Sequence, residues 1–222
     1  MNNWYQQNRG LLLFMLCIGL VRTSIADYNP IPSGSMRPTL LEGDVVLVNR
    51  VAYDYKLPFT DISLLRIADP QRGDIVTFIS PADGKRLIKR IVGVPGDRVE
   101  LRDEVLYVND VPAQYENLSK VSEPSPSGHE LTAVRATEHS GRSTRSVQFL
   151  PQVSAMRRFE TVALAPDSYF MLGDNRDNSG DSRYIGPVSR RALIGKAHHV
   201  LLSANILGNW LPRFERTAQR LY

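Results

Sequence analysis

The sequence contains very little cysteine and little histidine. Among its 222 residues there are one cysteine, Cys17, and four histidines. A single cysteine excludes an intrachain disulfide and argues against a cysteine-based metal site or a cysteine nucleophile. Because Cys17 lies in an apolar stretch, we interpret it as a packed or lipid-facing hydrophobic residue.

Strong charge of either sign is also missing. Lys and Arg number 27 against 23 Asp and Glu, which gives a formal net charge of +4. This excess is too weak and scattered for a nucleic-acid partner, whereas it suits an anionic lipid surface. With 42% apolar and 23% charged residues, the chain has the composition and length of one folded unit with a substantial core.

Long apolar runs are missing except for one near the N-terminus. Residues 11–21 carry no charge, and extended to Ala26 the segment has 16 residues, or about 24 Å of helix against a hydrocarbon core of about 30 Å. Its length also fits the core of a cleaved signal peptide, with the small residues Ser24 and Ala26 before the cut. We favour an uncleaved anchor, because Arg22 lies close to that cut.

The anchor interpretation divides the chain in two. Residues 1–26 form a tail and one transmembrane anchor, and residues 27–222 form a catalytic domain. Trp4-Tyr5 and Arg22 suit the two membrane interfaces, and Arg9 keeps the N-terminus in the cytoplasm. The remainder of the chain then lies outside.

Beyond the anchor the pattern is that of short strands. Apolar and β-branched runs are bounded by turns such as Gly43-Asp44 and Pro95-Gly96-Asp97. The class is therefore mainly β, built from antiparallel sheets. We expect strands over residues 45–48, 74–79, 86–94, 99–101, 105–108, 168–172 and 197–202, and one short helix over 189–194.

Two segments are less regular. Residues 113–146 are rich in Ser, Pro, Thr and Glu, which indicates loops or an irregular inserted subdomain, and we bound this insertion at residues 105–160. Residues 210–216 mix aromatic residues with arginines. We favour a packed or frayed terminus there over a segment that touches the membrane.

The reactive chemistry begins at Ser33-Gly34-Ser35-Met36-Arg37-Pro38. A serine hydroxyl becomes a nucleophile only when a positioned base accepts its proton. Of the four histidines, His129 and His139 fall in the loop-like insert and His198-His199 open a late strand. A Gly-x-Ser-x-Gly elbow would need glycines at positions 33 and 37, so a Ser-His-Asp triad is unsupported.

Lys89 is the better candidate base. It lies 54 residues beyond Ser35, within the apolar run Leu87-Ile88-Lys89-Arg90-Ile91-Val92. Strand alternation sends Leu87, Lys89 and Ile91 to one face, where burial disfavours the charged amine and lowers its pKa. The alternative is a lysine whose stem packs while its head reaches water. Local sequence does not separate these two.

A third polar segment runs from Gly173-Asp174-Asn175-Arg176-Asp177-Asn178 to Ser179-Gly180-Asp181-Ser182-Arg183-Tyr184. A calcium loop of the EF-hand type would need a terminal Glu that is missing here. Dense Asp, Asn, Ser and Arg after an apolar strand fit a buried, hydrogen-bonded loop that supports a site. In such a loop Ser179 can hold a neutral lysine amine, and Asp–Arg pairs can brace the turn.

Together, these motifs resemble those of the bacterial type I signal peptidases, which are membrane-bound Ser-Lys proteases that remove signal peptides. The matching segments are residues 31–48, 72–97 and 173–196, about a third of the chain, in the order of the family. The resemblance implies a mainly β catalytic domain of the signal-peptidase type with an inserted irregular β subdomain, held at the bacterial inner membrane with its catalytic side facing the periplasm. The single apolar run indicates one membrane pass. The resemblance implies no cofactor and no metal.

The resemblance also implies roles for single residues. Ser35 is the nucleophile, Lys89 the general base and Ser179 the serine that orients the lysine, while the Ser33 hydroxyl joins the Ser35 N–H in the oxyanion hole. Two supporting ion pairs are Asp181 with Arg183 and Asp174 with Arg90. A shallow pocket for small side chains at −1 and −3 of the substrate is formed by Ile31, Pro32, Met36, Leu40, Leu87 and Ile88.

The implied partners are signal-peptide-bearing precursors and the lipid bilayer, without nucleic acid, and we expect a monomer. The chain departs from better-known family members in having one evident N-terminal span and no disulfide in the insert. Three alternatives stay open. They are a self-cleaving Ser-Lys repressor, which needs an upstream DNA-binding domain; a specialised peptidase of a secretion or conjugation system; and a membrane-tethered binding module in which Ser35 and Lys89 are structural.

Overall fold

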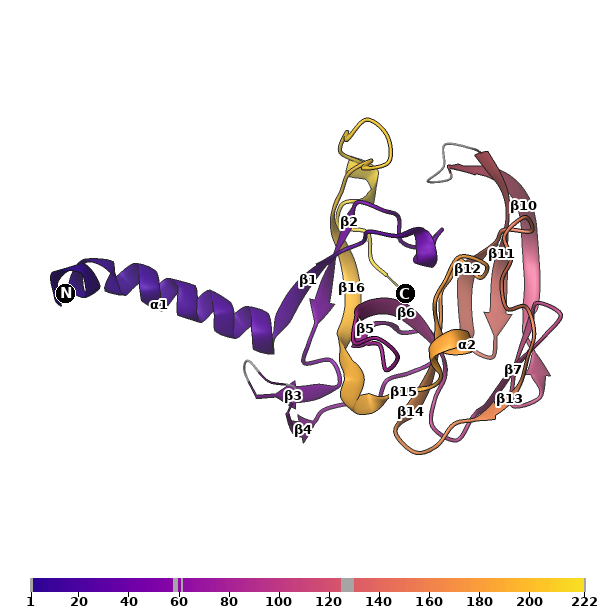
Figure 1. Cartoon of the computed structure of the whole chain (residues 1–222), viewed down its shortest axis with the longest axis horizontal. Helices are drawn as coiled ribbons and strands as arrows, with labels where there is room; N and C mark the ends of the chain where they lie inside the picture. Colours follow the sequence, from indigo (N-terminus) through magenta and orange to yellow (C-terminus); the bar gives the residue numbers. More distant parts are fainter. Residues whose placement is uncertain (1, 58–59, 61, 125–129, 222) are drawn as a thin grey trace.

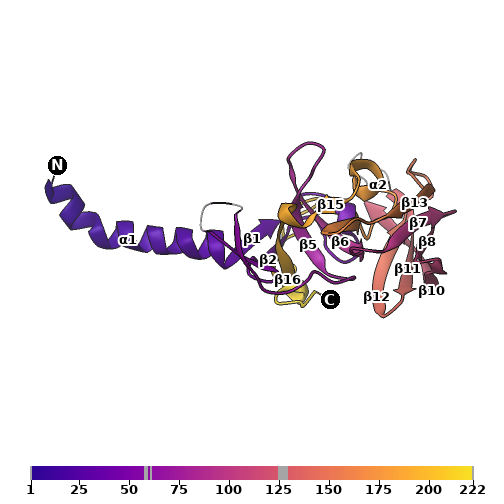
Figure 2. The same ribbon diagram turned by 90° about the horizontal axis from the view of Figure 1, so that it is seen from below.

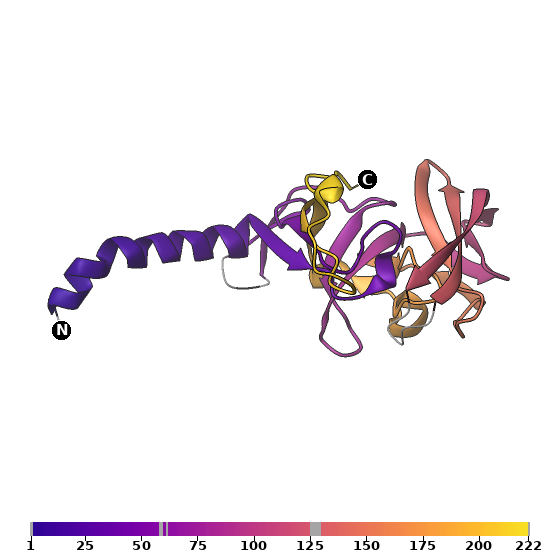
Figure 3. The ribbon, with the colours of Figure 1, turned by 90° about the horizontal axis from the view of Figure 1, so that it is seen from above.

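The chain forms one N-terminal helix followed by antiparallel sheets. A computed structural model describes residues 2–57, 60, 62–124 and 130–221. Helix α1 (Asn2–Ser24) extends away from the strands, and the sheet of β10, β11 and β12 lies at the opposite end of the molecule (Figures 1, 2 and 3). The expectation of a mainly β, antiparallel class is confirmed.

The largest sheet has seven strands in the order β1-β2-β16-β5-β6-β14-β15, each antiparallel to its neighbours. This order puts strand β6 between β5 and β14, which lie far apart in sequence. The strands are β1 (Ala26–Pro30), β2 (Asp44–Asn49), β5 (Ile75–Ile79), β6 (Arg86–Gly93), β14 (Ser168–Leu172), β15 (Val188–Ser189) and β16 (Leu193–Ser203).

The segment between β6 and β14 builds two further sheets. One has the order β13-β7-β8-β9, with β7 (Arg98–Arg102), β8 (Val105–Val108), β9 (Val111–Pro112) and β13 (Phe159–Ala163). The other has the order β10-β11-β12, with β10 (Gln114–Pro124), β11 (Glu130–Ser140) and β12 (Ser143–Phe149). We call the latter the insert sheet.

Short elements complete the described chain. The hairpin of β3 (Asp54–Lys56) and β4 (Ser63–Arg66) lies near the end of α1 that joins β1 (Figure 1). The short helices are η1 (Gly34–Met36), α2 (Ser182–Ile185), η2 (Arg190–Ala192) and η3 (Phe214–Arg216).

The alternation of side chains along β6 sorts its residues between apolar clusters. Leu87 and Ile91 pack into the cluster around Phe78, Tyr169 and Met171. Ile88 packs instead against the cluster that includes Val46 and Val48 of β2. A period of two residues therefore brings Lys89 to the face of Leu87 and Ile91, as its sequence pattern predicts.

Helix α1 differs from the expected anchor. No helix in the described part of the chain has the length and hydropathy needed to cross a membrane. The first turns of α1 carry Asn, Gln and Arg side chains, so its uncharged apolar part over residues 11–21 is about 16 Å long. The helix also ends at Ser24, because Ala26 already pairs with Asn49 in the main sheet. The expected continuation of the helix to Ala26 is wrong.

Of the two structures expected over residues 113–146, loops or an inserted irregular subdomain, the described part shows an inserted β subdomain and not loops. This segment forms most of the insert sheet, in which β10, β11 and β12 pair antiparallel, with one register shift between Glu116 and Ser119 of β10. Much of the insert sheet is exposed, so its strands carry the Ser, Thr and Glu residues that indicated loops. Ala133, Ala136 and Glu138 are buried on β11. Polar residues on a solvated face of a strand have the composition of a loop.

The helix expected over residues 189–194 is likewise replaced by other structure. Only Arg190–Ala192 form a 3-10 turn, and strand β16 begins at Leu193. Leu193 pairs with Phe78 of β5, so tertiary pairing overrides the local pattern. The histidines expected to open this strand, His198-His199, lie in its middle.

Candidate active site

The turn that carries Ser35 is closed and anchored in the core. Backbone hydrogen bonds from Ile31 to Asp44 and from Gly43 to Ile31 join the ends of the loop between β1 and β2. Within the loop, Met36 and Leu40 are completely buried in the apolar cluster that includes Val46 and Val48 of β2. The Ser35 backbone therefore sits on a fixed base rather than on a free surface loop.

Ser35 and Lys89 meet at hydrogen-bond distance. The Lys89 Nζ donates to Ser35 Oγ at 2.7 Å and to the carbonyl of Ile88 at 3.0 Å. Ser35 is 8% exposed and Lys89 is 3% exposed. The structure thus favours the buried-amine interpretation of Lys89 over a side chain whose head reaches water.

The surroundings of Lys89 favour its neutral form. Burial lowers the pKa of Lys89 from 10.5 to about 8, while the nearby carboxylates Asp181 and Asp174 oppose the shift and the Arg183 guanidinium adds to it. About one lysine in ten is then neutral at pH 7, against fewer than one in a thousand at the ordinary pKa. A neutral amine beside a hydroxyl can accept its proton.

The loop after β14 wraps around the Ser35 turn. The backbone N–H of Asn175 donates to the Ser35 carbonyl at 3.1 Å, and its side-chain Nδ2 donates to the Gly34 carbonyl at 3.0 Å. Asp181 accepts from the backbone N–H of Gly173 at 3.0 Å. Sequence analysis gave no role to Asn175, although it lies within the polar loop motif.

Both predicted ion pairs are present and buried. Arg183 donates to the two carboxylate oxygens of Asp181 at 2.8 and 2.9 Å. Arg90 donates to those of Asp174 at 2.9 and 2.7 Å. Two-pronged pairs of this kind fix orientation as well as charge. They hold the start and the end of the loop that supports the Ser35 turn.

Comparison with known proteins identifies the family of the chain. Residues 4–202 match the family described as "Signal peptidase, peptidase S26". The chain belongs to this family. It is 35% identical to the signal peptidase I of Pseudomonas aeruginosa over 86% of this chain and 69% of that protein. It is 36% identical to the signal peptidase I of Rickettsia felis over 92% of this chain and 82% of that protein.

A solved structure is also similar to the peptidase. It is the crystal structure of a signal peptidase I from Enterococcus faecalis, with 33% sequence identity and a TM-score of 0.35, and the match covers 59% of this chain and 97% of that one. Family membership makes this chain a serine endopeptidase.

Two further predicted site residues of the peptidase, Ser179 and Ser33, lie beside the Ser35 turn. Ser179 lies beside the site, because a Cβ built on Gly173 would come within 2.2 Å of Ser179 Oγ and 2.5 Å of the Ser35 carbonyl oxygen. Yet its buried hydroxyl has no hydrogen-bond partner among the described residues, Lys89 included. Ser33 is exposed and precedes η1 without a side-chain capping bond.

The six predicted pocket residues are not all at the surface. Ile31, Met36 and Leu40 are buried in the core, and Ile88 packs against the same cluster. Leu87 is half-buried on the opposite face of β6, and Pro32 is exposed. Any apolar surface that these residues offer a substrate comes chiefly from Pro32, Leu87 and Ile88.

The histidines lie elsewhere. His139 is on β11, while His198 and His199 contact each other through their Nδ1 atoms at 2.7 Å. None of these three bonds to Ser35, and His129 falls outside the described residues. Over the same described ranges, no group of three or more His, Cys, Asp or Glu side chains is arranged to hold a metal ion.

Proposed function

We propose that this peptidase removes signal peptides from exported precursors, with Ser35 as nucleophile and Lys89 as general base. The observation that carries the proposal is the 2.7 Å contact between Lys89 Nζ and Ser35 Oγ, with both side chains buried. Family membership supplies the reaction class. The lowered pKa of Lys89, about 8, supplies a base that works near neutral pH.

The reaction follows from this geometry. Neutral Lys89 accepts the Ser35 proton while Oγ attacks the scissile carbonyl, and the resulting ammonium gives a proton to the leaving amine. Lys89 then takes a proton from water, which attacks the acyl-enzyme, and the Lys89 ammonium returns this proton to Ser35 Oγ as the signal peptide leaves with a free carboxylate. The N–H of Ser35 and the hydroxyl of Ser33 donate to the oxyanion that develops in both steps.

The supporting residues keep this geometry. Asp181 with Arg183 and Asp174 with Arg90 fix the loop beneath the Ser35 turn. The buried hydroxyl of Ser179, which has no partner among the described residues, is available to orient the Lys89 amine. Small residues at −1 and −3 of the precursor contact the apolar surface around Pro32 and Ile88. No metal or cofactor takes part.

The proposal places the peptidase at a membrane. The six consecutive residues from Leu11 to Leu16 of α1 have exposed apolar side chains. Six consecutive residues cover more than one helical turn, so these side chains point to every side of the helix. We assign residues 1–26 to membrane attachment and residues 27–222 to a monomeric catalytic domain on the periplasmic side of the bacterial inner membrane. The insertion, residues 105–160, falls between the neighbouring strands β6 and β14.

The test is a cleavage assay on the full chain in detergent. A precursor with an Ala-x-Ala site is incubated with the wild-type protein, Ser35→Ala or Lys89→Ala, and the products are weighed by mass spectrometry. We expect wild-type cleavage after the second Ala and at least 10³-fold slower cleavage by both variants. Ser119→Ala, at an exposed serine of β10, is the matched control and keeps wild-type activity. Undiminished cleavage by Ser35→Ala contradicts the proposal, and no cleavage by the wild type favours a binding module.

A further inference from the structure

The insert sheet meets the nucleophile turn through buried charges. Arg37, two residues after Ser35, donates through Nε to Glu42 at 2.8 Å and through Nη1 to Glu123 on β10. Glu123 also accepts from Arg135 on β11. Arg37 is 8% exposed and Glu123 3% exposed, so the contact between them is shielded from water.

This ion pair acts on the backbone next to Ser35. A Cβ built on Gly34 would come within 2.8 Å of Glu42 Oε1 and 3.1 Å of Arg37 Cδ and Nε. The paired side chains therefore lie directly against Gly34, whose carbonyl accepts from the backbone N–H of Arg37 at 3.1 Å. Any shift of Arg37 moves the turn that presents the Ser35 hydroxyl and N–H.

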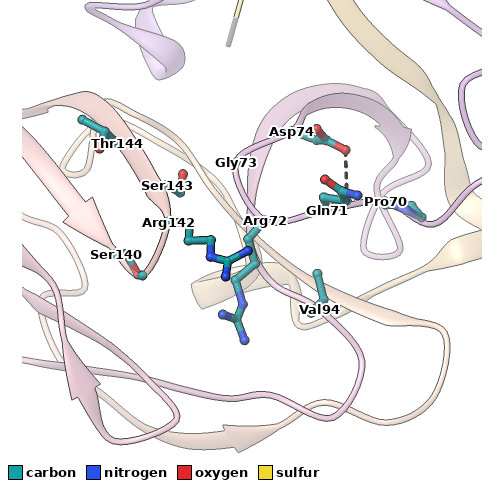
Figure 4. A pocket seen from close by; sticks show the side chains of 11 residues that line it. Pro70, Gln71, Arg72, Gly73, Asp74, Val94, Ser140, Arg142, Ser143 and Thr144 are labelled. Carbon is teal, nitrogen blue, oxygen red and sulfur yellow. Dashed lines mark hydrogen bonds between the residues drawn. The ribbon is translucent and has the colours of Figure 1, made fainter.

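Apolar packing does not join the insert sheet to this turn. The apolar cluster that includes Met36 and Leu40 contains no described residue of β10, β11 or β12. Between the β11–β12 turn and the segment that precedes β5, residues 70–74, lies a crevice of about 810 Å³, in which Arg142 faces Arg72 (Figure 4). A second crevice of about 350 Å³ separates Thr39 and Arg90 from Thr137 and Arg145. The polar contacts therefore set how the sheet and the turn are aligned.

A second set of contacts joins the sheet to the supporting loop. Gln148 at the end of β12 exchanges backbone hydrogen bonds with Asp174 and Arg176, each at 2.8 Å. The Arg176 guanidinium pairs with the completely buried Glu138 of β11. The insert sheet thus touches both segments that surround Ser35: the turn through Glu123 and the loop through Glu138 and Gln148.

We propose that Glu123 is a positioning residue for catalysis: through Arg37, the insert sheet holds the nucleophile turn in its reactive geometry. This inference rests on the proposed function of Ser35. Glu123→Gln removes the charge that faces the buried guanidinium of Arg37, and its single amide oxygen has to serve both Arg37 and Arg135. Breaking a buried charge pair in this way costs more than the pair contributes to stability. Because about 1 Å of misplacement can cost about 10²-fold in rate, we expect Glu123→Gln to lower kcat by about 10- to 100-fold.

The experiment compares Glu123→Gln, Glu123→Asp and Arg37→Lys with Glu130→Gln, the control. Glu130 is exposed on the same sheet, where it accepts from Ser122. We measure kcat and KM on an Ala-x-Ala peptide with the full chain, and divide kcat by the folded fraction from circular dichroism. We expect the loss in kcat alone, part of it recovered by Glu123→Asp, and no change for Glu130→Gln.

Two further measurements separate positioning from simple destabilisation. If Arg37 and Glu123 act through one contact, the double variant that combines Arg37→Lys and Glu123→Gln loses no more activity than the less active single variant. Hydrogen exchange, which needs no activity, should be at least tenfold faster over residues 33–38 in Glu123→Gln while β12 is unchanged. The inference is overturned if Glu123→Gln has the kcat of the wild type or loses only the activity that its unfolded fraction explains. It is also overturned if the activity losses of Arg37→Lys and Glu123→Gln add up in the double variant, or if hydrogen exchange over residues 33–38 is unchanged. Cleavage by Ser35→Ala bears instead on the proposed function.

Discussion

Replacing Lys89 by methionine should inactivate the peptidase and stabilise it at the same time. Methionine keeps a side chain of similar length and removes the ionisable amine. The pKa of Lys89 falls from 10.5 in the unfolded chain to about 8 in the folded one, chiefly through burial. At about 1.4 kcal/mol per pKa unit, this shift costs the folded state about 3 kcal/mol wherever the lysine is charged in both states.

The sign of the effect follows from proton binding. Between pH 8 and 10.5 the unfolded chain binds more protons at Lys89 than the folded chain, so the stability of the wild type rises with pH across this window. Below pH 8 the full penalty is present. Loss of the hydrogen bond to Ser35 removes about 1 kcal/mol from the gain. We therefore expect Lys89→Met to be about 2 kcal/mol more stable than the wild type at pH 7, and to lose this advantage by about pH 10.

The assay is urea unfolding of both proteins at pH 7 and pH 10, followed by far-ultraviolet circular dichroism. Circular dichroism is preferred because both tryptophans, Trp4 and Trp210, are strongly exposed and respond weakly to unfolding of the core. Lys85→Met is the control, since Lys85 is exposed on the same hairpin and its replacement should not stabilise the chain. A Lys89→Met protein that is less stable than the wild type at pH 7, or whose advantage is equal at both pH values, refutes the reasoning.

Two other changes test the supporting loop. Gly173→Ala should lower kcat at least tenfold, because its Cβ would come within 2.5 Å of the Ser35 carbonyl oxygen, whereas Gly180→Ala, which has nothing within 4 Å, should be silent in the same peptide assay. Asp181→Asn should cost about 3 kcal/mol in urea unfolding, because it leaves Arg183 buried without its charge partner. It should also shift the pH midpoint of its residual activity below about 8, since Asp181 raises the pKa of Lys89; an unchanged midpoint would contradict this electrostatic role.

Local patterns sufficed for strands β2, β5, β6 and β14 of the main sheet and for the face on which Lys89 lies, but not for β1, β15 or the start of β16. The pattern over residues 86–94 predicted both strand β6 and the face of Lys89, because the alternation of side chains has a fixed period and the run is long. The insert sheet could not be predicted in the same way. Its strands carry many exposed Ser, Thr and Glu residues, and their pairing depends on neighbours far along the chain.

The site shows the same division between local motif and tertiary contact. The motifs marked Ser35, Lys89 and the Asp–Arg pairs, but their meeting depends on residues 54 positions apart. Arg37 and Glu123 lie 86 positions apart, and nothing local in either segment indicates the other. Asn175 was missed because an amide in a polar loop has no distinctive spacing. Only the folded chain shows which carbonyl it binds.

The most direct test of the account is the pH dependence of kcat/KM for an Ala-x-Ala peptide between pH 6 and pH 10. If Ser35 is activated by neutral Lys89, whose pKa is about 8, the rate constant should rise about tenfold per pH unit below pH 8 and level off above it. A rate constant that is flat over this range, or that falls as the pH rises toward 8, would contradict the role of Lys89 as the base.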